Sequence, residues 1–246
     1  MYMPEGPVIV ILKEALQSFT GESILQAEGK ANSIDFAALK GKPIVAFKSW
    51  GKHLLICLPN FTIKVHLMLF GSWLINSRKE LPARLSLQFK KGEINFYACS
   101  VDRIDGSLNE IYDWSEDVMS NNWDSQNAIK KLNHCPGTMV CDALLNQHIF
   151  SGVGNIIRNE ALFRTHIHPA SLVGKIPLNK LEELVKETVN YSRQFYIWRK
   201  AGVLKSQWLV YNKDTCHKDK TRIVNQILGK TRRRCFYCSG CQKLYS

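Results

Sequence analysis

Thr62-Ile63-Lys64-Val65-His66-Leu67-Met68-Leu69 is the stretch that decides the fold class of the first half of the chain. Its apolar residues at positions 63, 65, 67 and 69 alternate with polar or bulky neighbours, which is typical of a half-buried β-strand. Further strand-like segments lie at residues 43–47, 53–58, 85–89 and 93–97, with a hairpin turn expected at Lys91-Gly92. These segments predict a β-sandwich over residues 1–115.

A helix is expected before the strands, because Pro7 suits a first helical turn and an apolar face follows it to Phe19. Residues 116–124, rich in Asp, Asn and Ser, predict a linker. Beyond the linker the pattern is helical, at about 125–133, 139–147, 154–164 and 177–199. The sequence therefore predicts a two-domain α+β protein, with a helical domain over residues 125–212 and a terminal hairpin over residues 213–246.

Composition narrows the class of protein further. The 246 residues are 45% hydrophobic and 22% charged, which describes a globular chain and not a disordered one. No apolar run reaches the length of a membrane span and no secretory signal is visible, so a cytoplasmic protein without a membrane partner is expected. The net charge of +12, with cations in excess over anions beyond residue 164, favours a polyanionic partner. A merely soluble basic surface is the alternative.

Half of the eight cysteines lie in the last 31 residues, where a metal site is expected rather than disulfides. Cys238-x-x-Cys241 has the spacing at which a tight turn presents two thiolates to one zinc ion. Cys216 supplies a third thiolate, and Asp219 stands where a fourth would belong. His217 and Cys235 are the other candidates for the fourth ligand, and a metal-free hairpin is the alternative to a zinc site.

Two segments predict contacts with phosphate. Arginines at positions 232–234 precede the cysteine pair, on an expected hairpin where they would be exposed. In Gln147-His148-Ile149-Phe150-Ser151-Gly152-Val153-Gly154-Asn155-Ile156 the glycines allow a sharp turn between two helices. Asn155 then begins a helix, where free backbone N–H groups can bind an anion.

The start of the chain, Met3-Pro4-Glu5-Gly6-Pro7, predicts nucleophilic chemistry. If translation begins at Met3, methionine removal leaves Pro4 with a free secondary amine, which can attack an aldehyde-like carbon to form an iminium. Glu5 can shuttle the protons. With Met1 and Tyr2 in front, the Pro4 nitrogen is part of an amide, and the simpler interpretation is a turn leading into a helix.

Two segments of the strand region add to this pattern. Lys52 lies in a basic turn that enters a strand, within Lys48-Ser49-Trp50-Gly51-Lys52-His53. Met68, Leu69 and Phe70 precede a glycine turn, and such apolar residues can fill the gap left by a base that leaves a DNA stack. A core strand is the simpler interpretation of these three residues.

In this order, the motifs resemble those of the formamidopyrimidine-DNA glycosylase/endonuclease VIII family of DNA repair enzymes. The resemblance covers nearly the whole chain, and Pro-Glu-Gly-Pro with the His66–Gly71 segment is more like the endonuclease VIII branch. It implies a β-sandwich followed by a helix-two-turn-helix domain and a zinc-finger-like hairpin. It also implies a monomer that acts on double-stranded DNA with a damaged base or abasic site, in the nucleoid.

By this resemblance, Pro4 attacks C1′ of the damaged nucleotide, Glu5 is the acid/base and Lys52 assists beside the lesion. Asn155 and Arg233 bind the phosphates that flank the flipped nucleotide. Met68, Leu69 and Phe70 supply the wedge. The structural zinc ligands are Cys216, Asp219, Cys238 and Cys241.

This sequence departs from the family pattern at four places. Met1-Tyr2 precede the proline, Val8 replaces a second glutamate, and Asp219 replaces a cysteine. The family's Asp-Pro-Arg-Arg-Phe-Gly loop is also replaced around Arg103, which becomes a candidate for filling the void opposite the orphaned base. Removal of oxidised bases followed by β,δ-elimination is the leading prediction. A catalytically silent binder of damaged DNA and a zinc-ribbon protein of transcription or translation are the alternatives.

Overall fold

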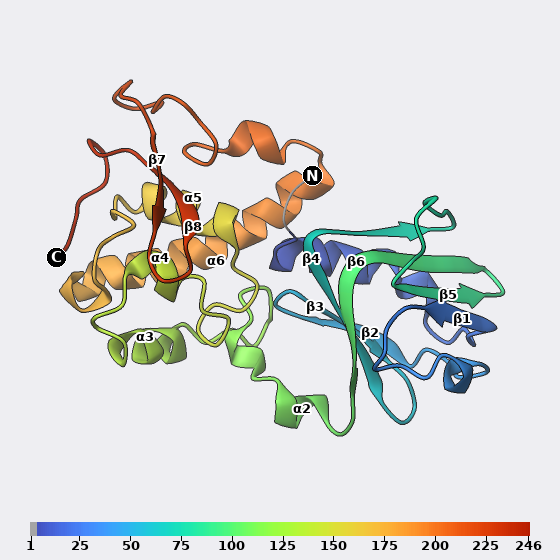
Figure 1. The fold of residues 1–246 in the computed structure, drawn as a ribbon. Helices are drawn as coiled ribbons and strands as arrows, with labels where there is room; N and C mark the ends of the chain where they lie inside the picture. The colour runs from blue at the N-terminus through green and yellow to red at the C-terminus, as the bar shows by residue number, and fades with distance from the viewer. Residues whose placement is uncertain (1–3) are drawn as a thin grey trace. The chain divides into compact units, whose positions relative to one another are not determined.

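The computed structural model describes residues 4–246 and divides the chain into two compact units. The first ends at Tyr112, and the second spans Asp113–Ser246. The expected translation start at Met3 concerns residues that lie outside the described part. The first unit is a sheet with one main helix, and the second is helical with a terminal hairpin, so the predicted two-domain α+β class is confirmed (Figure 1).

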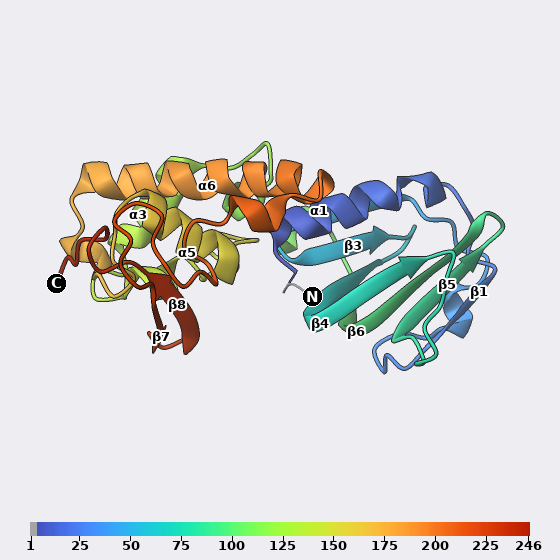
Figure 2. The same cartoon turned by 90° about the horizontal axis from the view of Figure 1, so that it is seen from above.

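The six strands of the first unit form one antiparallel sheet, in the order β1-β5-β6-β4-β3-β2 (Figure 2). The strands are β1 (Gln26–Gly29), β2 (Ala46–Trp50), β3 (His53–Cys57), β4 (Thr62–Ile75), β5 (Leu85–Phe89) and β6 (Gly92–Ile104). Helix α1 (Gly6–Ala15) packs on β2 and β3. Ile9 and Leu12 of α1 are fully buried in the core that the sheet encloses. The predicted β-sandwich is thus a single six-stranded sheet with α1 packed on β2 and β3.

An irregularity in β4 interrupts its pairing with β6. Leu67 pairs with Cys99 and Ser72 pairs with Tyr97, so four residues of β4 lie opposite the single residue Ala98. Ala98 adopts a left-handed φ of 48°, which fits a strand that is locally disrupted and then resumes. The insertion carries β4 to Ile75, well past the predicted end at Leu69.

The second unit contains four α-helices: α3 (Ser125–Asn133), α4 (Val140–Ala143), α5 (Asn155–Arg164) and α6 (Leu178–Lys200). Short α2 (Leu108–Ile111) belongs to the first unit. The helix predicted over residues 139–147 is shorter and ends at Ala143, and the segment after it is held by the Gln147 side chain. Its Nε2 donates to the Leu145 oxygen at 2.8 Å and to the Val153 oxygen at 3.1 Å.

Residues 116–124, expected to be a linker, pack within the second unit. Val118 is fully buried, and the Glu116 carboxylate lies 2.6 Å from the Lys131 ammonium of α3. Asp124 caps α3 by accepting from the backbone N–H groups of Gln126 and Asn127. The side chains of this segment therefore help to fix the start of the helical unit.

The chain ends in a two-stranded hairpin of β7 (Val224–Leu228) and β8 (Arg233–Tyr237). Its turn is formed by residues 229–232, in which Gly229 has a φ of 70° and Arg232 a φ of 49°. Both are left-handed conformations, which glycine adopts without a side-chain clash. Within residues 4–246, none of the helices combines the length and the apolar character needed to cross a membrane.

Candidate functional site

Pro4 and Glu5 lie at the start of α1. Both are buried, and Glu5 is fully so. The backbone carbonyl oxygen of Glu5 accepts a hydrogen bond from the Val8 backbone N–H at 2.8 Å. Pro7 occupies the first turn of the helix, where its missing N–H costs nothing. A glutamate side chain is seldom fully buried unless it is paired, and Glu5 does have interaction partners in the structure. Val8 is a buried helix residue and cannot take the part of a second carboxylate.

Lys52 lies in the two-residue turn between β2 and β3. Trp50 and His53 pair across this hairpin, and Gly51 takes a φ of 52°. That conformation favours glycine, and it is common in tight hairpin turns. Because α1 packs on these same two strands, the local fold brings together the two elements that carry Glu5 and Lys52.

An aromatic cluster lies directly beside the Lys52 turn. His53 pairs with His66 of β4, their ring centroids 5.2 Å apart, and Tyr112 places its hydroxyl 3.3 Å from His53 Nδ1. Burial lowers the pKa of His53 to about 4, with the neighbouring His66 and Lys64 acting in the same direction. Burial, followed by the charges of Lys52 and Lys64, also lowers the pKa of His66. Both imidazoles are therefore neutral at pH 7, near Lys52 and near Lys64, which pairs with Asp102 at 3.2 Å.

The low pKa of His53 predicts that acid destabilises the protein. Above pH 6.5 neither the folded nor the unfolded chain protonates His53. As the pH falls from 6.5 towards about 4, the unfolded chain binds the proton first. The free energy of unfolding therefore falls by at most about 3 kcal/mol. Urea unfolding at pH 7 and pH 4.5 should show a smaller difference for His53→Gln than for the unchanged protein. The exposed His134→Gln is the control, and an unchanged pH dependence in His53→Gln would contradict the prediction.

Met68, Leu69 and Phe70 lie in the β4 irregularity and are exposed, Phe70 by 70%. The core-strand interpretation of these three residues is therefore wrong. At Gly71 the backbone returns close to Leu67. A Cβ at position 71 would lie 2.8 Å from the Leu67 Cα, so a larger residue would clash there. Three adjacent exposed apolar side chains thus lie together in the β4 irregularity.

Arg103, the candidate for filling the void, is engaged within its own unit. Its guanidinium pairs with Asp105 at 2.7 Å and lies 4.2 Å from the centre of the Phe61 ring. The side chain is 45% exposed. To reach another group, Arg103 would have to leave both contacts.

In the second unit, the structure places Asn155 beside the strand that carries Arg233. Asn155 begins α5 and its Nδ2 donates to the Arg234 oxygen of β8 at 3.1 Å. Arg158 donates to the same oxygen at 2.7 Å, and Asn159 accepts the Phe236 N–H at 2.8 Å. The start of α5 and strand β8 thus form one hydrogen-bonded surface, on which Arg233 is exposed.

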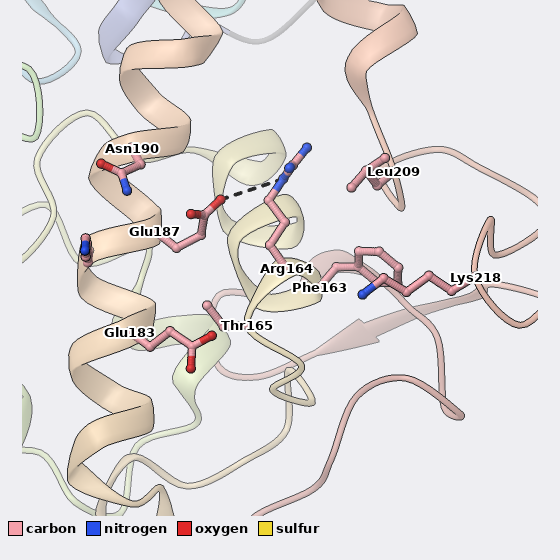
Figure 3. Close-up of a pocket in the computed structure, with 9 residues that line it drawn as sticks. Phe163, Arg164, Thr165, Glu183, Glu187, Asn190, Leu209 and Lys218 are labelled. Carbon is pink, nitrogen blue, oxygen red and sulfur yellow. Dashed lines mark ion pairs between the residues drawn. The ribbon is translucent and has the colours of Figure 1, made fainter.

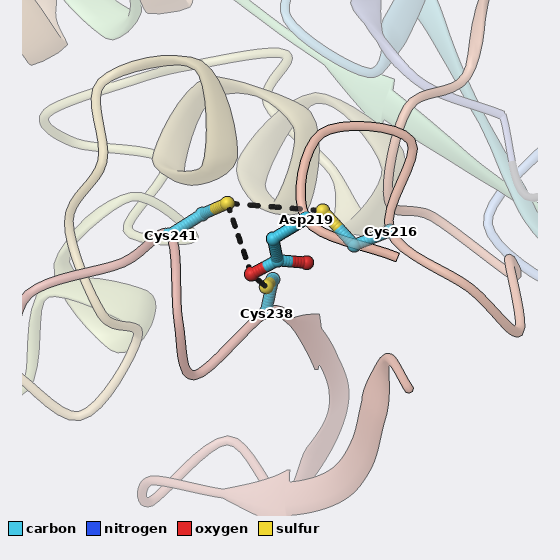
Figure 4. A group of neighbouring side chains, drawn as sticks. All are labelled: Cys216, Asp219, Cys238 and Cys241. Atoms are coloured by element: carbon cyan, nitrogen blue, oxygen red, sulfur yellow. Dashed lines mark hydrogen bonds between the residues drawn. The ribbon is translucent and has the colours of Figure 1, made fainter. Parts of the chain in front are cut away.

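Four side chains near the C-terminus can hold a metal ion: Cys216, Asp219, Cys238 and Cys241 (Figure 4). Their ligand atoms all lie within 4.8 Å of one another. Three sulfurs and one oxygen at this spacing suit a closed tetrahedral zinc site. Of the three candidates for the fourth ligand, Asp219 is in this group, whereas the His217 ring packs against Phe163.

The two oxygens of Asp219 have different surroundings. Oδ1 accepts from the Thr221 backbone N–H at 3.0 Å and from its hydroxyl at 2.8 Å. Oδ2 faces the sulfurs of Cys238 at 3.1 Å and Cys241 at 3.5 Å. Hydrogen bonds from Cys238 and then Thr221 lower the pKa of this carboxyl. Asp219 therefore presents a single oxygen to the thiols and is oriented by a partner on its other side.

One residue that supports these surfaces, Glu160, was not among the predicted site residues. Glu160, fully buried, accepts the backbone N–H groups of Leu209, Val210 and Tyr211 at 2.9–3.1 Å. It follows Asn155 on α5 and fixes the segment that leads to the metal-binding group. A glutamate directly before the apolar residues Ala161, Leu162 and Phe163 is the sequence signal for this role.

A pocket of about 420 Å³ lies between the end of α5 and α6 in the same unit (Figure 3). Its arginine, Arg164, is balanced by carboxylates, with Glu160 at 3.6 Å and Glu187 at 3.9 Å. Lys218 also lines it, with Nζ at 3.2 Å from His166 Nε2. The two carboxylates offset the charge of Arg164 within this pocket.

Comparison with known proteins finds family matches in both units of the chain. Residues 3–99 match the family model of the formamidopyrimidine-DNA glycosylase N-terminal domain, and residues 115–194 match that of its H2TH domain. Endonuclease 8-like 3 of Xenopus laevis is 33% identical over 85% of this chain, and endonuclease 8-like 2 of Bos taurus is 32% identical over 70%. The chain spans 36% and 50% of the length of these two relatives.

Solved structures with the same fold include a viral DNA glycosylase, with a TM-score of 0.85 and 22% identity over 97% of this chain and 100% of that one. Another is Lactococcus lactis formamidopyrimidine DNA glycosylase bound to DNA with an abasic site. It has a TM-score of 0.86 and 19% identity over 97% of this chain and 99% of that one. The two matching domain models, the relatives and the shared fold lead to one conclusion. This chain belongs to the formamidopyrimidine-DNA glycosylase/endonuclease VIII family.

Proposed function

We propose that this chain is a base-excision repair DNA glycosylase and AP lyase that removes oxidised bases, pyrimidines or formamidopyrimidines, and then cleaves the abasic strand by β,δ-elimination. The observation that carries the proposal is the Pro4-Glu5 pair at the start of α1, in a chain of this family. The relatives' names and the abasic-site complex of the Lactococcus lactis protein support the choice of damaged double-stranded DNA as substrate. Such an enzyme would act as a monomer on nucleoid DNA in the cytoplasm.

In the proposed reaction, the free amine of Pro4 attacks C1′ of the damaged nucleotide, and the bond from C1′ to the base breaks. Glu5 donates a proton to open the sugar and later removes one to support elimination. Lys52, on the hairpin turn beside the two neutral histidines, binds phosphate next to the lesion. Leu69, flanked by Met68 and Phe70, enters the stack when the nucleotide is flipped out.

Zinc is proposed as a structural ion held by Cys216, Asp219, Cys238 and Cys241. A closed four-ligand site leaves no position for a substrate, so the metal would only brace the loops on either side of the hairpin. The hairpin residues themselves, led by Arg233, would then contact DNA.

A catalytically silent binder of abasic or bent DNA is the second candidate. Two observations favour it: with Met1–Met3 in front, the Pro4 nitrogen is part of an amide, and Val8 stands in place of a second glutamate. The test is incubation of the protein started at Met3 with duplexes that carry one oxidised pyrimidine, one abasic site or no lesion. Release of the base and strand cleavage on damaged DNA alone support the enzyme. Tight binding of the abasic duplex without cleavage supports the silent binder.

The phosphate-binding role of Arg233 gives a prediction of its own. Arg233→Ala should weaken binding to an abasic-site duplex about tenfold or more. It should also reduce the magnitude of the slope of the log association constant against the log salt concentration by about 1. The physical reason is the loss of one cation that neutralises a backbone phosphate. The measurement is fluorescence anisotropy at several salt concentrations.

Arg193→Ala on α6 is the matched control for this experiment, since it removes the same charge from an exposed position of the same unit. Asn155→Ala should weaken binding in the same direction as Arg233→Ala, because Asn155 holds β8. Equal effects of Arg193→Ala and Arg233→Ala would show that only net charge matters and that the assignment of Arg233 is incorrect.

A further inference from the structure

Asp142 holds the turn of the C-terminal hairpin, although it lies on α4, nearly ninety residues earlier in the chain. One carboxylate oxygen accepts the Lys230 backbone N–H at 2.7 Å. The other accepts the Thr231 backbone N–H at 3.1 Å and its hydroxyl at 2.6 Å. Three donors therefore converge on one side chain, which uses both oxygens.

The turn is shaped to receive this carboxylate. A Cβ at Gly229 would lie 2.4 Å from both oxygens of Asp142, so a larger residue at position 229 would displace it. The residues on either side of Asp142, Cys141 and Ala143, are buried, which fixes α4 beneath the hairpin. Figure 1 shows α4 close to the β7–β8 turn.

The strand beyond the turn is held at a second place. Asn155 and Arg158 of α5 both donate to the Arg234 oxygen, and the Asn159 side chain accepts the Phe236 N–H. Arg233 lies between these two attachments, on a backbone that is fixed on both sides. The exposed cations of the turn and strand thus extend from a rigid platform.

We propose that Asp142 is a positioning residue for DNA recognition, which acts by fixing the hairpin turn so that Arg233 is presented to a backbone phosphate. This inference rests on the proposed DNA-binding function. A pre-ordered turn loses less conformational entropy on binding, and a charge-assisted hydrogen bond orders a backbone N–H more firmly than a neutral one.

The charge of Asp142 makes the proposal distinguishable from simple electrostatics. An acidic side chain among four cations of the hairpin lowers the positive potential that attracts DNA. If charge alone mattered, Asp142→Asn would tighten binding. If positioning dominates, the same change weakens binding, because an amide NH₂ cannot accept the second of the two backbone N–H groups.

The experiment compares Asp142→Asn with Glu182→Gln, which removes the same charge from an exposed position of α6. Binding to an abasic-site duplex is measured by anisotropy over a range of salt, together with the single-turnover rate of strand cleavage at saturating protein and the melting temperature. Asp142→Asn should raise the dissociation constant about tenfold, with the saturated rate and the melting temperature nearly unchanged. Glu182→Gln should leave the dissociation constant unchanged or slightly lower.

Thr231 provides a conservative rescue. Thr231→Val removes one of the three donors and should weaken binding in the same direction, whereas Thr231→Ser keeps the hydroxyl and should bind as the unchanged protein does. Equal or tighter binding by Asp142→Asn would overturn the proposal, as would a fall in the saturated rate that matches the loss of affinity. Failure of the unchanged protein to bind damaged DNA would instead refute the proposed function.

Discussion

Substitution of Glu5 by Gln in the protein started at Met3 is expected to lower excision of an oxidised base about 10²–10⁴-fold, the contribution typical of a positioned acid/base group. Glu5 is fully buried at the start of α1, so Gln can occupy its place with little change of volume. Affinity for an abasic-site duplex should stay within a few-fold, because Glu5 is assigned no phosphate contact. The measurement is base release under single-turnover conditions.

Pro4 is tested in parallel by borohydride trapping on an abasic-site duplex. The Met3-start protein should give a covalent adduct, and the form that begins at Met1 should not, because its Pro4 nitrogen is an amide. The yield should rise with pH through about 8, as the amine loses its proton. Adducts of equal yield from both forms would place the nucleophile elsewhere. No adduct from either form, despite tight binding, would assign the chain to the silent binders.

Local sequence patterns predicted several of the regular elements. The strand predicted over residues 85–89 is β5, and the helix predicted over residues 125–133 is α3. Strand β1 was not predicted, because Gln26–Gly29 has no apolar alternation and is defined by its pairing with β5 at the sheet edge. The full length of β6 was missed because Ala98 interrupts its pattern with a left-handed residue.

The site was predictable to the extent that its residues stand in motifs. Asn155 and Arg233 could each be singled out from sequence, but the hydrogen bonds that join α5 to β8 connect residues almost eighty positions apart. The choice among Asp219, His217 and Cys235 depends on the course of the loop after Cys216. In that loop Lys220 takes a left-handed φ of 62°, and the backbone turns the Asp219 carboxylate towards the cysteines.

Cys238→Ser in the full chain is expected to reduce bound zinc from about one ion per chain to almost none and to disorder the segments around the hairpin. Structural zinc sites contribute about 10–16 kcal/mol of apparent binding energy in zinc-finger peptides, which far exceeds what a two-stranded hairpin supplies alone. Loss of hairpin order should abolish binding to damaged DNA, because Arg233 lies on β8. Zinc content by mass spectrometry and amide exchange over residues 213–246 measure the two effects, with Cys135→Ser outside the metal group as control.

The role of Asp219 is separated from that of the thiols by a second pair of variants. Asp219→Ala should weaken zinc affinity in a chelator competition, and Asp219→Cys should restore it. Cobalt(II) substituted for zinc should show weaker sulfur-to-metal charge-transfer absorption in the unchanged protein than in Asp219→Cys, because an oxygen replaces one sulfur. Identical cobalt spectra would mean that Asp219 is not a ligand even if zinc is bound. Absence of zinc from the unchanged protein would mean that the loops are held without a metal. They would then depend on packing and on the hydrogen bonds that Thr221 and Cys238 donate to the Asp219 carboxylate.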